Sequence, residues 1–122
     1  MNGIDKITSA SLITAARVVG SNVFNTEGQK LGVIDDIMID RASGRAVYAV
    51  MGFGGFLGLG ESHHPLPWPM LHYDPAKGGY IVALSKEQLR DAPYYGKGDN
   101  FDWTPEYGRR VDSYYRMPTF WE

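Results

Sequence analysis

The chain has 122 residues and a formal net charge of −2, which suits one domain and argues against a protein that binds nucleic acid chiefly through its charge. It contains no cysteine, so disulfide bonds, thiolate metal sites and cysteine nucleophiles are excluded. No apolar run approaches the roughly 20 residues of a membrane span, and no basic start followed by an apolar stretch marks a secretion signal, so we expect a cytoplasmic protein without a transmembrane segment. These features leave peripheral membrane association open.

Residues 1–20 form a lead-in, in which Thr14 can cap a one-turn helix and Gly20 can end it. Residues 21–92 then alternate short apolar runs with turns rich in Gly and Asp. The pattern predicts short strands at 21–25, 30–40, 45–53, 63–68, 70–74 and 80–84. Ser85 and Gln88 have the spacing of a capping box, so a short helix follows the last strand. We therefore predict a mainly β fold, a small antiparallel β-barrel of five to six short strands with one or two short helices.

Three strands carry features that fix their place in the sheet. The strand at 45–53 is apolar on both faces, which predicts a central, covered position. The strand at 63–68 contains prolines, which lack a ladder donor, so it is expected at an edge or in a bulged crossing. In the strand at 30–40, Asp35 falls in the two-residue register of four apolar side chains, Leu31, Val33, Ile37 and Ile39. Because burying an unpaired carboxylate is costly, we expect a β-bulge at Asp35 and Asp36, or a carboxylate hydrogen-bonded to the backbone.

Several of these segments together resemble the PRC-barrel family, which is named for the cytoplasmic barrel of the photosynthetic reaction-centre H subunit. Val19 to Asp40 resembles the family's opening hairpin, and Arg45 to Phe53 resembles its next strand. His64 to Leu71 resembles the segment that returns to the barrel through an aromatic residue flanked by prolines. The resemblance covers roughly residues 12–92, so we assign the barrel domain to 21–92. The remaining residues, 93–122, resemble the aromatic tail of small standalone bacterial members.

The resemblance implies an assembly or docking module without a catalytic centre or cofactor of its own. The H subunit would require an N-terminal membrane helix, and the ribosome-maturation factor that shares the barrel would require a preceding RNA-binding domain. Neither precedes the barrel in this sequence, so neither specific role is carried over. We expect a protein that is not an enzyme, an adaptor that acts as a homodimer or on an unknown protein partner.

The run from Gly52 to Glu61 is rich in glycine but lacks the Lys and Ser or Thr that complete a phosphate-binding loop. A connection that crosses the barrel end is the favoured explanation of the glycines. Its apolar side chains, if exposed together, would form a contact surface. We therefore predict interaction residues at Phe56, Leu57 and Leu59.

The aromatic extension, residues 93–122, holds nine of the 16 aromatic residues of the chain. Thr104 followed by Pro105 predicts a helix start, and the helix should run to about Tyr115. So many rings can order the segment against a surface, which is the tail's own barrel, a sister chain or a foreign partner. The predicted interaction residues in this segment are Trp103, Tyr107, Tyr114, Tyr115 and Trp121.

Two alternatives to the adaptor remain. A small-ligand or metal sensor would use His63 and His72 with Glu61 or Asp74, although a structural role is the favoured explanation of these histidines. A ribosome- or RNA-associated factor would use three arginines that lie among tyrosines, Arg109, Arg110 and Arg116. Acidic neighbours of these arginines reduce their field, so nucleic acid is not the favoured partner.

Overall fold

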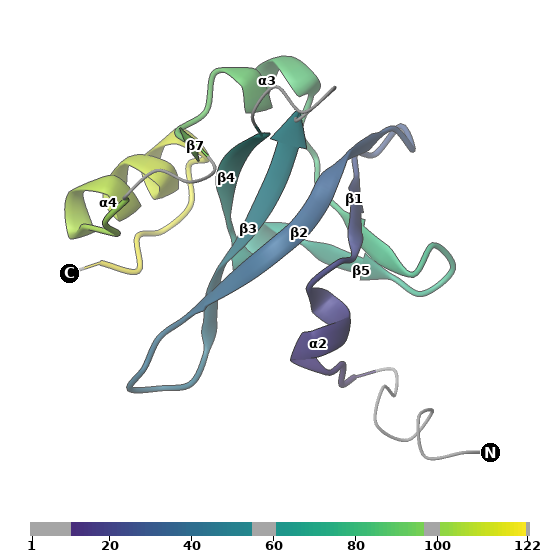
Figure 1. The fold of residues 1–122 in the computed structure, drawn as a ribbon, viewed down its shortest axis with the longest axis horizontal. Coiled ribbons are helices and arrows are strands. Elements are labelled where there is room, and N and C mark those ends of the chain that lie inside the picture. Colours follow the sequence, from purple (N-terminus) through teal and green to yellow (C-terminus); the bar gives the residue numbers. More distant parts are fainter. Residues whose placement is uncertain (1–10, 55–60, 97–100, 122) are drawn as a thin grey trace.

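The computed structural model describes residues 11–54, 61–96 and 101–121 (Figure 1). The described residues form a single seven-stranded sheet, with three α-helices and one 3-10 helix (η2) around it. The elements, in chain order, are α2 (Ala15–Val18), β1 (Asn22–Phe24), β2 (Lys30–Ile39), β3 (Ala46–Gly54), β4 (Glu61–Pro67), η2 (Trp68–Met70), β5 (His72–Asp74), β6 (Gly79–Ile81), α3 (Lys86–Arg90), β7 (Tyr95–Gly96) and α4 (Pro105–Tyr114).

The strand order is β5-β6-β1-β2-β3-β4-β7, so the predicted mainly β fold is confirmed. Three details differ from the prediction. The sheet has seven strands, which is more than the five to six predicted. Strand β7 was not predicted because its two residues are too few to produce a periodic pattern. The pair β1–β6 is parallel, with Val23 opposite Tyr80, because β6 returns to β1 through a long excursion instead of a hairpin. In the described residues the ladder does not close from β7 to β5, so the barrel is an open, curled sheet.

The predicted bulge in β2 is confirmed. Ile34 lies opposite Met51, and Asp36 lies opposite Val50, so Asp35 is the extra residue. A second register shift follows between Met38 and Ile39. The extra residue Asp35 moves the side chains that follow it to the other face, so Ile34 and Ile37, three residues apart, pack in the same buried cluster and Met38 packs in another.

The proline-containing half of β4 lies at an edge, as predicted. β7 pairs only with Ser62 and His63, so the part of β4 that contains Pro65 and Pro67 has β3 on one side and no strand on the other among the described residues. Proline is tolerated there because its missing N–H points to the unpaired side.

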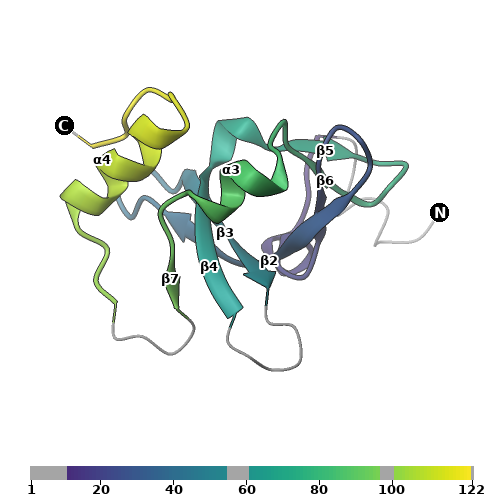
Figure 2. The ribbon, with the colours of Figure 1, turned by 90° about the horizontal axis from the view of Figure 1, so that it is seen from above.

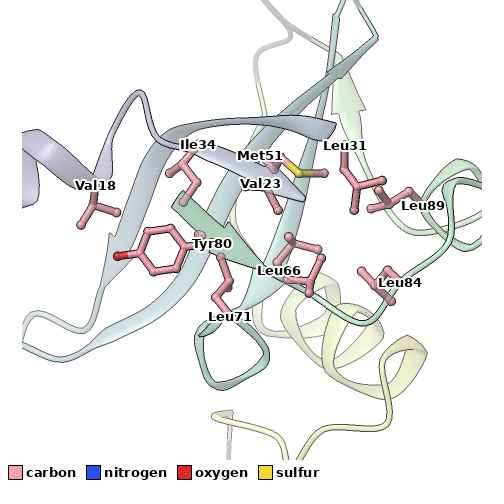
Figure 3. Packing of buried hydrophobic residues seen from close by; sticks show 12 residues of the cluster. Val18, Val23, Leu31, Ile34, Met51, Leu66, Leu71, Tyr80, Leu84 and Leu89 are labelled. Atoms are coloured by element: carbon pink, nitrogen blue, oxygen red, sulfur yellow. The ribbon is translucent and has the colours of Figure 1, made fainter. Parts of the chain in front are cut away.

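β3 is covered on both faces and separates two clusters of buried side chains. The first, which we call the sheet core, is largely aliphatic and fills the inside of the curled sheet beneath α3 (Figure 3). Its buried members are Val18, Val23, Leu31, Ile34, Ala49, Met51, Leu66, Leu71, Tyr80, Val82, Leu84 and Leu89. Figures 1 and 2 place α4 beyond β4 and β7, far from α2. There it covers the outer face of β3 and completes the second cluster.

The three predicted helix starts are confirmed by their caps. Thr14 Oγ1 accepts from Arg17 N, Ser85 and Gln88 form a full capping box, and Thr104 Oγ1 accepts from Tyr107 N. Gly20 has a positive φ of 95°, which ends the first helix turn as expected. No helix in the described part of the chain is long and apolar enough to cross a membrane.

Candidate interaction site

The aromatic extension folds back on the chain's own sheet and forms the second cluster, which we call the extension cluster. Tyr48 of β3 meets Tyr107 and Val111 of α4 at its centre, and all three are buried. The half-buried side chains around them are Met38, Val47, Tyr95, Phe101, Trp103, Tyr115 and Trp121. Gly108 faces the Trp121 ring, and a Cβ at this position would collide with the indole. The helix therefore needs a glycine there so that the last residues can pack over it.

A hydrogen-bond network ties α4 and the C-terminal residues to β3. The Tyr48 hydroxyl donates to Asp112 Oδ1 at 2.9 Å and accepts from Trp121 Nε1 at 2.8 Å. Asp112 Oδ2 accepts from Thr119 Oγ1 at 3.0 Å and from Phe120 N at 3.2 Å. Burial, with the Asp112 charge adding to it, raises the pKa of Tyr48 far above its usual value, so the phenol stays protonated and keeps donating.

On the other side of α4 lies a cleft of about 700 Å³, which we call the tyrosine–arginine cleft. It opens between α4 and the residues that connect α3 to β7. The side chains that give it its chemical character are Asp91, Tyr94, Glu106, Arg109, Arg110 and Tyr114.

Both tyrosine rings of the cleft are exposed and held from behind. Tyr94 is 56% exposed and stacks on the buried His64, with ring centroids 5.4 Å apart. Tyr114 is 38% exposed, its hydroxyl donates to Gln88 O at 2.6 Å, and its ring meets Tyr115 edge-on at 5.0 Å. Because each ring is fixed by a second contact, little side-chain entropy remains to be lost on binding.

Two histidine–tyrosine stacks join the sheet to the start of the extension. His64 on Tyr94 is one, and His63 on Tyr95 at 5.3 Å is the other. His63 Nδ1 also lies 3.4 Å from Asp35 Oδ2, the carboxylate of the bulge. Burial lowers the pKa of His64, and the neighbouring His63 acts in the same direction, so His64 is held neutral.

The predicted interaction residues fall into three groups. Trp103, Tyr107, Tyr115 and Trp121 belong to the extension cluster, and Tyr114 lines the cleft. Phe56, Leu57 and Leu59 lie outside the described residues. For all eight predicted interaction residues, a role in binding another chain stays a prediction. Tyr94 was expected as a contact only as one of the nine aromatic residues of the extension. Tyr48 and Asp112 were not predicted, and their hydrogen bond joins positions 64 residues apart.

The residues of the two alternatives are placed differently. His63 lies on β4 and His72 on β5, which stand near opposite ends of the strand order, and no group of three or more His, Asp or Glu residues in the described chain is arranged to hold a metal ion. Arg109 and Arg110 line the cleft, and Arg116 does not. The Arg110 guanidinium lies over the Tyr107 ring at 5.7 Å.

The chain is a small, mainly β domain in which a curled sheet is followed by a C-terminal extension with one helix, α4. The PRC-barrel domain matches residues 11–89, and the chain belongs to the PRC-barrel family. No curated protein matches the sequence. Among solved structures, a 16S ribosomal RNA processing protein, RimM, from Pseudomonas aeruginosa is similar, with 24% identity and a TM-score of 0.42. The similarity covers 66% of this chain and 48% of that one, so the chain spans about half the length of RimM.

Proposed function

We propose that this PRC-barrel protein is a non-catalytic adaptor that acts through protein–protein contacts at the tyrosine–arginine cleft, and that it associates with a second copy of itself. One observation carries the proposal. Two tyrosine rings, Tyr94 and Tyr114, stand exposed over the cleft while buried or hydrogen-bonded contacts fix them from behind. Tyrosine and arginine are the residue types that most often dominate the binding energy of protein interfaces.

The charges of the cleft favour protein over nucleic acid. Arg109 and Arg110 are matched by Asp91 and Glu106 in the same lining. A phosphate backbone would gain from the arginines and lose from the carboxylates, whereas a protein surface can present both signs. The ribosome- or RNA-associated alternative stays a prediction, and it is tested by the same variants below.

Sedimentation of the full-length chain over a wide concentration range tests self-association. Replacing Tyr94 and Tyr114 together by alanine should weaken the dimer by at least about tenfold, as expected for two central tyrosines. Tyr73→Ala is the matched control, because Tyr73 is 43% exposed but lies on β5, at the other end of the strand order. Equal dimerisation in both variants would place the interface elsewhere.

If the wild-type chain is monomeric throughout, the homodimer is wrong and only a foreign partner remains. A photo-reactive side chain at Ser113, which lines the cleft, then tests that partner in cells. A discrete protein adduct that is lost in Tyr94→Ala and kept in Tyr73→Ala supports the adaptor. An adduct that disappears on ribonuclease treatment and with rising salt overturns it in favour of RNA.

A further inference from the structure

A second cavity, of about 460 Å³, lies beside the C-terminal end of α4 and is separate from the tyrosine–arginine cleft. The turn between β2 and β3, the end of β4 and the residues after α4 enclose it. Its walls are mainly apolar, and the side chains that matter most here are Val47, Pro67, Met117, Pro118 and Phe120. A concave, largely apolar cavity of this size with a few polar groups is typical of a small-molecule site.

Of the charged residues that line this cavity, Asp40, Arg45 and Asp112, only Asp112 is buried, with 3% of its surface exposed. It accepts hydrogen bonds from three neutral donors, whereas a carboxylate can accept about four. In the part of the chain that the structure describes, no Lys, Arg or His lies within ion-pair distance of it. A buried carboxylate without a cation is costly, so a cation at this point would be strongly attracted.

The backbone adds to the negative potential at the same place. Asp112 lies in the last turn of α4, where the helix dipole is negative, and that turn contains no basic residue. At the rim of the cavity, Asp40 accepts from Ser43 Oγ at 2.6 Å, and the nearby Arg45 favours its charged form. The charges of Asp40 and Arg45 offset each other, so Asp112 leaves the lining of the cavity with a net negative charge.

We propose that this cavity is a binding site for a small organic cation, a primary ammonium group on a short apolar chain. The ammonium donates to the Asp112 carboxylate in a charge-assisted hydrogen bond, and the apolar chain lies against Pro67, Pro118 and the Phe120 ring. Phe120 is 43% exposed, so its ring is available to cover the bound chain. This inference is independent of the adaptor role, since it uses the opposite side of α4.

The test is a titration of the full-length protein with n-butylammonium, followed by the backbone amide resonances of Thr119 and Phe120. Neutral n-butanol and the butyrate anion are the matched probes. We expect n-butylammonium to bind at least about tenfold more tightly than n-butanol, and butyrate to show no saturable binding, because only the cation meets the carboxylate. Equal affinity for the ammonium and the alcohol would overturn the proposal, leaving an apolar cavity without charge selectivity.

Two variants locate the site. Ala46 lines the cavity, so Ala46→Phe should fill it and abolish ammonium binding while leaving the contacts of Asp112 in place. Asp112→Asn should remove the preference for the cation, and Glu106→Gln, the same change of charge in the other cleft, should leave it intact. If Asp112→Asn does not fold, as judged by circular dichroism, Ala46→Phe and the probe series decide. Ammonium binding that persists in Ala46→Phe would place the cation elsewhere and overturn the proposal.

Discussion

The sheet core and the extension cluster share β3 but are built from different chemistry. In the sheet core, Ile34, Met51 and Leu66 are fully buried, and aliphatic packing dominates. In the extension cluster, rings meet at defined angles, such as Tyr95 on Phe101 at 4.2 Å and Trp103 on Tyr107 at 90°. The hydrogen-bond network around Tyr48 and Asp112 joins these rings to α4. The sheet core therefore depends on volume, and the extension cluster depends on single polar atoms.

This difference predicts two kinds of response to substitution. Removing volume from the sheet core should destabilise the whole domain, because the strands on both sides of β3 pack around it. Removing one polar atom from the extension cluster should loosen α4 and the residues after it, while the sheet keeps its own packing.

The largest effect is expected for Leu66→Ala in the sheet core. Leu66 is fully buried, so its truncation should lower the free energy of unfolding by about 2–5 kcal/mol. The urea unfolding midpoints measured by far-UV and by aromatic circular dichroism should fall together, because the whole domain is affected. Ile39→Ala, at a position that is 55% exposed, should change stability by less than about 0.5 kcal/mol. If only the aromatic signal shifted in Leu66→Ala, the sheet core would not support the whole domain, and the prediction would be wrong.

The next effect distinguishes two buried tyrosines of the extension cluster. Tyr48→Phe removes a hydroxyl that serves Asp112 and Trp121, so it should lower the free energy of unfolding by about 1–3 kcal/mol. Tyr107→Phe removes a buried hydroxyl that has no hydrogen-bond partner among the described residues, so it should be neutral or stabilising. The two variants lose the same atom, and urea unfolding should show a loss of stability in Tyr48→Phe and none in Tyr107→Phe. Equal losses would mean that packing, and not the network, holds the cluster.

The sequence predicted the sheet better than the extension cluster for a physical reason. Strand alternation, capping boxes and turn glycines are local signals, and they identified β2, β3 and all three helix starts. Even the bulge at Asp35 was visible, because a carboxylate in an apolar register conflicts with burial. The two-residue strand β7 and the parallel pair β1–β6 depend on tertiary contacts and leave no local pattern.

The candidate sites were harder to predict because their members are distant in sequence. The richness in rings marked the extension as important, but the periodicity did not say which rings would be buried. Tyr107 is buried in the extension cluster, whereas Tyr94 is exposed and stacks on His64, a partner 30 residues away. Asp112 appeared as one acid among arginines, and only the fold shows that it is buried against Tyr48.

A smaller effect concerns the junction between the two regions and depends on pH. His64 is almost fully buried between Phe53 and Tyr94, and burial lowers its folded pKa below the usual value of about 6.5. The groups that act on it are His63, Ser62 and the backbone of Leu89. Because the unfolded chain binds the proton more readily, stability should be complete above about pH 6.5 and should fall as pH drops toward the folded pKa, with a slope of at most about 1.4 kcal/mol per unit.

The variant His64→Phe keeps a ring against Tyr94 and removes the titrating group. Its free energy of unfolding should vary less with pH below about 6.5 than that of the wild type. Val19→Ala, at a position that is 41% exposed and carries no titrating group, is the control and should retain the wild-type slope. Identical slopes for wild type and His64→Phe would show that His64 does not couple protonation to folding.

The smallest effect lies at the end of α4, where Arg116 adopts the left-handed conformation with a φ of 57°. Met117 N donates to Asp112 O at 2.9 Å and Arg116 N donates to Ser113 O at 3.1 Å, which is the Schellman pattern that glycine normally closes. A side chain with a Cβ costs about 1–2 kcal/mol in this conformation, so Arg116→Gly should raise the free energy of unfolding by up to about 1 kcal/mol once the entropy of the unfolded glycine is included. Arg116→Ala removes the same guanidinium but keeps the Cβ, so it should give no gain. If alanine stabilises as much as glycine, the cost comes from the arginine charge and not from the backbone, and the extension cluster would then be limited by electrostatics at its C-terminal end.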